Sequence, residues 1–487
     1  MSTLQTAAAH FAAMSTFRAD RERAKRYCYG RQWDDLIEAD GRIMKEEDYI
    51  RSRGNVPLKN NLIRRLVRSV LGVFRNQYAF PSPASLGLDP DSPASRLLYD
   101  RLRRNADLNS LPELLARTME EFLISGLAVH RKSSSRTSPL HMPGVAAPEP
   151  FLRTDYVAPD SFFVDAAARD FRGWDIRIIG QTHDIPFSTL CAAMARSRAD
   201  VARFRDIFAS ASSPSFLSSL SGFGSPASSS LRSFYTPPSP DLCRVIEVWT
   251  RDSQERLRVH DLRSGRVFIT TTAHASRLQA DPHLRLSWHM ADTWHYHFFA
   301  PTGETLAEGK SPLPGGGHPY VWKAYPFIDG EIHSFVADVI DQQRHTNRLI
   351  TLYDWVLRST AKGVLLFPET ALPEGVDIND ISDQWSRFNG VILFRPKAGM
   401  PIPQQVTGSA SKVGITDLLN IQLNMFEDVS GVSGALEGKL ASGAVSGKLY
   451  DQQTRQAMIA LQDILDSFNV FIQDSLHRDL TLLNNQP

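Results

Sequence analysis

Apolar residues recur at intervals of three and four positions in several separate stretches of the chain. From Leu62 to Phe74 this spacing predicts a helix with one buried face, and Asn60 and Asn61 stand where they can cap its start. The same spacing predicts further helices at 111–125, 332–357, 415–429 and 448–483. Arg64, Arg65, Arg68 and Arg75 lie off the apolar stripe of the first helix, so we expect them at its surface.

Alternating apolar and polar residues, rich in β-branched and aromatic types, predict strands in the middle of the chain. The expected strands lie at 128–131, 151–165, 244–267 and 284–299, and the last two should belong to an antiparallel sheet. A compact strand-helix-strand module is expected at 363–406, with its parts at 364–367, 378–388 and 391–394. Gly315–Gly317 marks a turn. These patterns together predict an α+β fold.

Two segments have compositions that are typical of loops. Residues 209–240 hold 13 serines and a single charged residue, Arg232, which favours a flexible insertion. Residues 431–447 hold several glycines among small residues between two predicted helices, which favours a mobile loop.

The long predicted helix that follows Gly330 carries a polar belt halfway along its length. A helix of about 27 residues spans about 40 Å, and this one is polar all round over 341–348. Burying such a belt in the core of a monomer is energetically unfavourable unless its polar groups find hydrogen-bond partners. Neighbouring copies of a chain can easily supply these partners. The residues that we expect between subunits are Asp341, Gln342, Gln343, Arg344 and Asn347.

Composition and charge narrow the classes of protein that the chain can belong to. It has 487 residues, 42% of them hydrophobic, and a net charge of +1, so its charge neither supports nor excludes contact with nucleic acid. Cys28, Cys191 and Cys243 are far apart and form no ligand spacing, which suits a reducing cytoplasm. The sequence contains no secretion signal and no apolar run of membrane-spanning length, so we expect a soluble protein.

The usual catalytic and cofactor motifs are missing from the sequence. It contains no P-loop, no H-E-x-x-H, no G-x-S-x-G and no G-x-G-x-x-G, so we expect neither enzymatic activity nor a cofactor. His283, His289, His295 and His297 are the best candidates for metal ligands, but aromatic residues are interleaved and ordinary sheet packing is the favoured interpretation. Acidic pairs such as Asp338 with Asp341 are expected to form solvated or partner-facing surfaces.

Short patterns distributed along the whole chain resemble the portal proteins of tailed bacteriophages. Near the amino terminus they comprise Tyr27, Gly30, Gln32, Trp33, Pro57, Asn61, Val70, Gly72 and Arg75. Further on they comprise Gly330, Asp341, Gln342, Gln343 and Asn347, then 430–434, Ser446, Gly447 and Gln452. Each pattern alone is weak, and the resemblance depends on their order and spacing.

The resemblance implies a domain map for a portal fold. Residues 1–330 would form a wing of helices and sheet with the Ser-rich insertion 209–240, 331–362 a first stem helix, and 363–406 the clip. Residues 407–430 would form a second stem helix, 431–447 a tunnel loop, and 448–487 a wing helix bordering the channel, with little or no crown. DNA-facing residues of the loop would be Lys439, Ser442, Ser446 and Lys448. Partner-facing residues of the clip would be Glu369, Glu374, Asp377, Asp380, Asp383, Arg387, Arg395 and Lys397.

The function implied by the resemblance is a closed ring, of about twelve copies, at one vertex of the capsid. It would pass double-stranded DNA without sequence preference during packaging and ejection, and would be assembled in the bacterial host cytoplasm. Its partners would be further copies of itself, the large terminase subunit, head-tail adaptors, and the major capsid and scaffold proteins, but no membrane. The alternatives are another head-tail connector or minor capsid protein, or a DNA-processing enzyme.

Overall fold

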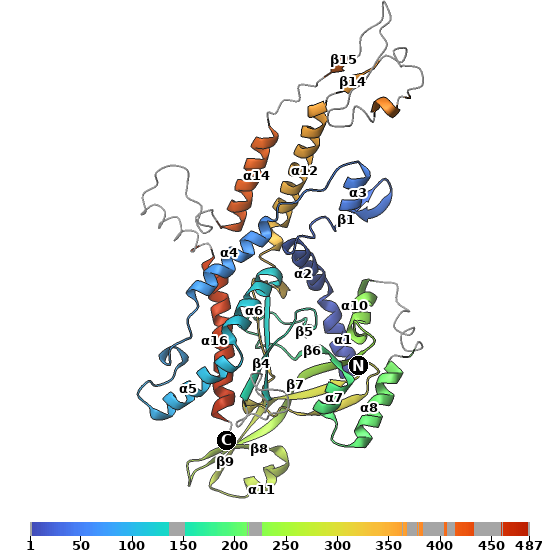
Figure 1. Ribbon diagram of the computed structural model, residues 1–487. Helices are drawn as coiled ribbons and strands as arrows, with labels where there is room; N and C mark the ends of the chain where they lie inside the picture. The colour runs from blue at the N-terminus through green and yellow to red at the C-terminus, as the bar shows by residue number, and fades with distance from the viewer. Residues whose placement is uncertain are drawn as a thin grey trace, which may run out of the picture. The chain divides into compact units, whose positions relative to one another are not determined.

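A computed structural model describes residues 2–135, 151–211, 213, 226–362, 364–367, 377, 379–382, 404–406, 414–432, 459 and 461–485 of the chain. The chain folds into two compact units (Figure 1). Unit 1 comprises residues 1–29, 63–338 and 431–487, and unit 2 comprises residues 30–62 and 339–430. Each unit is therefore assembled from segments that are distant in sequence.

The described residues of unit 1 combine helices with two larger antiparallel sheets and one short hairpin. Its helices are α1 (Thr3–Ala13), α2 (Ser15–Cys28), α4 (Leu62–Gln77, whose first residue belongs to unit 2), α5 (Pro93–Leu108), α6 (Leu111–Ser125), α7 (Phe187–Met194), α8 (Arg198–Ala211), α10 (Pro226–Tyr235), α11 (Ala275–Gln279) and α16 (Gln462–Asn484). Short 3-10 turns are η1 (Ala84–Leu86), η2 (Thr272–His274), η3 (Pro314–Gly316) and η4 (Ala337–Val339, at the unit boundary). The predicted helices at 62–74 and 111–125 are confirmed as α4 and α6.

The larger sheet of unit 1 contains the strands that the sequence predicts most clearly. Its order is β10-β9-β7-β6-β5, with β8 paired to β7. The strands are β5 (Phe162–Val164), β6 (Ile178–Pro186), β7 (Leu242–Asp261), β8 (Val267–Thr271), β9 (Leu284–Phe299) and β10 (Thr305–Lys310). β7 and β9 pair along sixteen residues, from Ile246↔Phe299 to Asp261↔Leu284. The antiparallel pairing predicted for 244–267 and 284–299 is thus confirmed, and the mixed helices and sheets confirm the α+β class.

A smaller sheet has the order β11-β3-β4, with strands β3 (Leu127–Ser135), β4 (Phe151–Tyr156) and β11 (Tyr320–Ala324). A separate two-residue hairpin joins β12 (Phe327–Ile328) to β13 (Glu331–Ile332). The predicted turn at the triple glycine is also confirmed, because Gly315 and Gly316 adopt positive φ angles of 76° and 68° there.

Part of the Ser-rich segment is helical, which corrects the expectation that all of it is a flexible insertion. α10 covers Pro226–Tyr235, and Phe234 within it is fully buried. The Phe234 ring lies 4.9 Å from that of Phe11 in α1 and 5.9 Å from that of Phe163 in β5, measured between centroids. One large aromatic side chain thus anchors a segment whose overall composition is typical of a loop.

α16 completes the core of unit 1. Phe468 lies against Phe74 and Phe122 at centroid distances of 5.2 and 5.5 Å, and Phe471 lies 4.8 Å from His130. A buried ion pair adds to this packing, because Nζ of Lys132 in β3 lies 2.8 Å from Oδ2 of Asp479 in α16.

Burial lowers the pKa of Lys132 and raises that of Asp479, and the attraction between the two groups opposes both shifts. Five packed aromatic rings and this ion pair therefore tie α16 to the helices and the small sheet.

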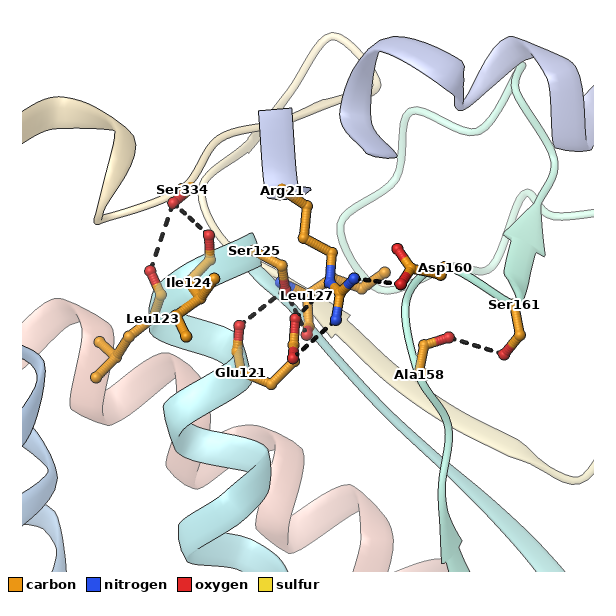
Figure 2. A network of polar contacts seen from close by, with 10 residues as sticks. All are labelled: Arg21, Glu121, Leu123, Ile124, Ser125, Leu127, Ala158, Asp160, Ser161 and Ser334. Carbon is orange, nitrogen blue, oxygen red and sulfur yellow. Dashed lines mark hydrogen bonds and ion pairs between the residues drawn. The ribbon is translucent and has the colours of Figure 1, made fainter. Parts of the chain in front are cut away.

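A second polar cluster in unit 1 joins α2, α6 and the loop between β4 and β5 (Figure 2). The buried Arg21 guanidinium donates from Nε to Glu121 Oε1 at 2.6 Å and forms an ion pair with Asp160 at 2.5 Å. Ser334 Oγ donates to the Ile124 carbonyl at 2.6 Å, which fixes residue 334 to the carboxyl end of α6.

The chain just before α12 departs from the sequence expectation. Helical spacing predicts a helix from 332, but residues 331–332 form β13, and α12 begins at Ile340. Hydrogen bonds explain this start, because Val336 N donates to the Leu123 carbonyl and Ser334 donates to Ile124. These tertiary bonds hold residues 334–336 on α6 and remove them from helix formation.

Unit 2 is a pair of long helices with a small amino-terminal segment. It comprises β1 (Leu36–Ala39), β2 (Arg42–Lys45), α3 (Glu46–Ser52), α12 (Ile340–Lys362), β14 (Val364–Leu366), β15 (Gln404–Val406) and α14 (Ile415–Ser430). α12 and α14 lie side by side, and the antiparallel pair β14-β15 follows α12 and precedes α14 (Figure 1). The predicted helix at 415–429 and the strand at 364–367 are therefore confirmed.

Candidate functional site

One face of α12 holds three polar side chains against residues 30–62 of the same unit. Gln343, Asn347 and Thr351 are four residues apart, so they lie on one side of the helix. Gln343 and Asn347 are fully buried, and Thr351 is 9% exposed. Gln343 and Asn347 belong to the belt that the sequence marks as polar, and Thr351 lies just beyond it.

Gln343 and Asn347 bond to the backbone that leads into α4. Gln343 Oε1 accepts from Leu62 N at 2.8 Å, and its Nε2 donates to the Asn60 carbonyl at 2.7 Å. Asn347 Oδ1 accepts from Asn60 N at 3.1 Å. The two amides also bond to each other, since Gln343 Nε2 lies 3.0 Å from Asn347 Oδ1.

Gln32 extends this buried network. Asn347 Nδ2 donates to Gln32 Oε1 at 2.6 Å, and Gln32 Nε2 donates to Asn61 Oδ1 at 3.0 Å. One turn further along α12, Thr351 Oγ1 accepts from Leu58 N, and the Leu58 carbonyl accepts from Trp33 Nε1; both distances are 3.1 Å. The buried amides have partners on several sides, so the network fixes the amino-terminal half of α12, called its base below, on residues 30–62.

Glu46 adds a charged contact beside the amides. This carboxylate is 3% exposed and accepts from Nη2 of Arg344 at 2.9 Å and from Nε of Arg348 at 2.7 Å. Arg344 and Arg348 are one turn apart on α12. A single acid at the start of α3 therefore holds two arginines of the long helix.

The outward surface of the helix pair is unusually apolar. Leu418, Ile421, Met425 and Val429 are each about half exposed, at 48–52%, and they form a stripe along α14 at intervals of three and four residues. Leu352, Trp355 and Leu357 of α12 are 42–49% exposed. So much apolar surface on two adjacent helices is typical of a subunit interface.

The five predicted stem residues all lie at the start of α12. Asp341 is exposed and Gln342 is half-buried, while the other three take part in the contacts above. Gln343, Arg344 and Asn347 thus have partners in their own chain, so a neighbouring copy is not needed to satisfy them. Contact between subunits at these residues stays a prediction.

Most of the predicted clip and loop residues fall outside the described parts of the chain. This holds for Lys439, Ser442, Ser446, Lys448, Glu369, Glu374, Asp383, Arg387, Arg395 and Lys397, and for the predicted strand at 391–394. Asp377 and Asp380 are described and exposed, and Asp380 Oδ2 accepts from Asp377 N at 3.0 Å.

Sequence reasoning missed that residues 30–62 belong with the long helices, because it assigned all of 1–330 to one region. A signal was available, since Gln32, Trp33 and Asn61 are among the residues that carry the resemblance near the amino terminus. Gln343 and Asn347 carry it some three hundred residues later. The structure shows that these two groups of residues bond to each other.

The remaining candidates are the histidines and acidic residues that could hold a metal ion. In the described ranges, no three His, Cys, Asp or Glu side chains come together where they could hold a metal ion. His297 lies 3.4 Å from Glu308 on the neighbouring strand and stacks on Phe299. Among the helices that the structure describes, none is both long enough and apolar enough to cross a membrane.

A profile of a known protein family matches nearly the whole chain. The profile of the phage P22-like portal proteins matches residues 4–476, which include both halves of the polar network and both long helices. No curated protein matches the chain. Portal proteins are structural rather than enzymatic, and the family implies a ring that forms the DNA channel at a vertex of the viral capsid. Since the match covers nearly the whole sequence, the chain belongs to the phage P22-like portal protein family.

Proposed function

We propose that about twelve copies of this chain close into a ring whose stem is built from α12 and α14. The observation that carries the proposal is the apolar stripe Leu418, Ile421, Met425 and Val429, which a single chain leaves about half exposed. Burying apolar surface gains about 25 cal/mol per Å², and cyclic symmetry repeats that gain at every interface. The stripe would thus be covered by a neighbouring copy.

The polar network has a complementary part in this proposal. A ring interface requires that each subunit present its helices at one fixed angle, because an error in angle recurs at every interface and prevents closure. Gln343, Asn347 and Glu46 fix the base of α12 on residues 30–62. The amino-terminal segment would thereby set the direction of the stem.

The ring proposal is tested by electron microscopy and mass photometry of the purified protein. The wild type should give rings with a central channel and a mass near that of about twelve chains of 54.5 kDa. Ile421→Asp places a charge in the stripe and should yield mostly smaller species. Asn420→Asp adds the same side chain to an exposed position off the stripe and should still form rings. Rings of unchanged mass from Ile421→Asp would contradict this interface.

We further propose that residues 363–406 form a clip that docks the large terminase subunit and afterwards the head-tail adaptors. Support comes from the β14-β15 pair, which closes this segment at its base, and from its many charged residues. Deletion of 368–390 should abolish cosedimentation with the large terminase subunit, while electron microscopy still shows the wing. Undiminished cosedimentation would overturn the clip assignment.

The tunnel loop at 431–447 would contact DNA only transiently, because strong phosphate contacts would slow a sliding duplex. We propose Lys439 as one such contact, repeated once per subunit around the channel. Lys439→Ala particles should package more slowly or retain less DNA than wild type. Normal packaging speed and full-length genomes would show that Lys439 is an ordinary loop residue without the proposed contact to DNA.

A further inference from the structure

The outer part of the large sheet in unit 1 ends in an edge strand. β7 and β9 extend beyond the body of the sheet, and β8 pairs with the outer half of β7, from Arg256↔Thr271 to His260↔Val267. Within the described part of the chain, β8 has a strand neighbour on one side only. Figure 1 shows β8 in the outer part of the sheet. Backbone donors and acceptors along its other side are thus open to pairing.

This edge strand has little of the protection that such strands usually carry. β8 has the sequence Val-Phe-Ile-Thr-Thr, without proline or charge. Val267, Phe268 and Ile269 are 49%, 44% and 61% exposed. Edge strands normally avoid unwanted pairing through charged residues, proline or a bulge. An apolar, β-branched edge is therefore suited to accept another strand.

The two faces of this part of the sheet differ in character. On one face Leu257 and Val259 of β7 are buried, whereas the alternating positions Arg256 and Arg258 point to the opposite face. Arg285 of β9 lies on the same face as the two arginines, since it pairs with His260. Among the described residues, none of these three arginines has a carboxylate within ion-pair distance. The open face is consequently cationic.

A shallow hollow lies on this cationic face next to the edge. It has a volume of about 640 Å³ and is lined by Arg258, Val267, Phe268, Ile269, Ser287 and His289. The hollow brings an arginine head group and the apolar side chains of β8 to the same place. A ligand that fills it needs both apolar and anionic groups.

We propose that the β8 edge binds an extended segment of another protein in which apolar and acidic side chains alternate. The segment would add to β8 as a further strand, and its backbone would supply the missing hydrogen bonds. Alternate side chains of an added strand point to opposite faces. Acidic residues would therefore lie over Arg256 and Arg258, and apolar ones would continue the face of Phe268.

The charge and shape of the surface favour an acidic segment over a nucleic-acid duplex and over a second copy of β8. A duplex would need a track of cations without intervening apolar groups, but Val267 and Ile269 stand between the arginines and the edge. A second copy of β8 would place apolar side chains together but would leave Arg258 without a partner. Only an acidic segment satisfies the edge and the arginines together.

The test uses the full-length protein and short fluorescent peptides of about eight residues, which is within the usual length of a strand. A peptide of alternating valine and glutamate should bind, as measured by fluorescence anisotropy, and should bind more weakly in high salt. A valine-lysine peptide should bind at least tenfold more weakly. Of two valine-glutamate peptides methylated on alternate amides, one should lose binding, because only one set of amides faces β8.

Substitutions in the protein provide the matched controls. Arg258→Glu should weaken binding of the valine-glutamate peptide at least tenfold and should improve binding of the valine-lysine peptide. Ile269→Ser should weaken the first peptide several-fold. Arg277→Glu makes the same charge change on the exposed surface of α11 and should leave the affinity unchanged. The unfolding midpoint and particle mass of each variant should match wild type.

Several results would overturn the proposal. Failure of the valine-glutamate peptide to bind at millimolar concentration would show that the edge does not accept such a segment. Equal binding of both methylated peptides would show attraction by charge without strand pairing. Tighter binding by a short DNA duplex that displaces the peptide would mark a nucleic-acid surface. A changed particle mass for Ile269→Ser would mark an interface between copies of this chain.

Discussion

Replacing Glu247 should reveal how strongly one buried charge cluster stabilises the large sheet of unit 1. This carboxylate is fully buried on β7. Its Oε2 lies 3.0 Å from Nε of Arg131 on β3 and 2.7 Å from Nε2 of His183 on β6. Trp249 Nε1 donates to its Oε1 at 2.8 Å. Glu247→Gln keeps the size of the side chain and removes the charge.

The expected cost follows from the pKa of this carboxyl. Burial alone would raise it, but the charge of Arg131 and the hydrogen bond with His183 outweigh burial and lower the pKa from 4.5 to about 2. Each pKa unit corresponds to about 1.4 kcal/mol, so the ionised form contributes about 3 kcal/mol to the free energy of unfolding. Glu247→Gln should lose an amount of that order at pH 7.

Because the folded-state pKa is depressed, the contribution is fully present above the unfolded-state pKa and is lost as the pH falls through the folded-state pKa. The difference between wild type and Glu247→Gln should therefore be constant above pH 5 and should shrink between about pH 4.5 and pH 2. Urea unfolding followed by tryptophan fluorescence measures this difference at each pH.

Glu308→Gln is the matched control, because its carboxylate lies on β10 of the same sheet and its side chain is 63% exposed. This variant should change the free energy of unfolding by less than about 0.5 kcal/mol. Wild-type stability of Glu247→Gln at pH 7 would refute the reasoning. So would a difference that persists undiminished at pH 2, because the charge would then not be its source.

Three further changes test other parts of the structure. Asn347→Leu should lower the free energy of unfolding, measured in urea, by about 2 kcal/mol, since it leaves buried donors and acceptors without partners. A loss smaller than that caused by the same substitution at an exposed asparagine would argue against the network. Lys132→Met should lower the free energy of unfolding by about 3 kcal/mol because Asp479 would be buried without its cation, and adding Asp479→Leu should restore most of the loss. Gly126→Ala should lower the thermal midpoint strongly, because a Cβ there would lie 2.0 Å from the His333 carbonyl oxygen and φ is +76°; an unchanged midpoint would show that the backbone can shift.

The sequence predicts best those elements whose pattern is local. α4, α6, α14, β7 and β9 each carry an apolar repeat of the right period, and each is found where the repeat places it. α10 was missed because the many serines of its segment outweigh one buried aromatic residue, Phe234, in any reading of composition. The start of α12 was placed too early for a similar reason, since tertiary hydrogen bonds at Ser334 and Val336 override the helical spacing.

Only part of the candidate site could be predicted from the sequence. The polar belt on α12 is evident from the residues, and so is its cost if it were buried without partners. Its partners are not evident, because Gln32 and Asn347 are 315 residues apart, and a hydrogen bond over that distance leaves no periodic pattern. A polar belt can be satisfied by a neighbouring subunit or by a distant part of its own chain, and only the three-dimensional structure distinguishes these.

The interleaving of the two units sets an order for folding during synthesis. Residues 30–62 are made before α12 and must wait for that helix before their buried partners exist. The first and middle segments of unit 1 must wait longer still, because Phe468 and Phe471 in α16 are made after both long helices. Nascent chains therefore expose the apolar stripe of α14 only when little of unit 1 is still missing. Synthesis order itself thus delays association until most of unit 1 has been made, which disfavours rings that contain chains without that unit.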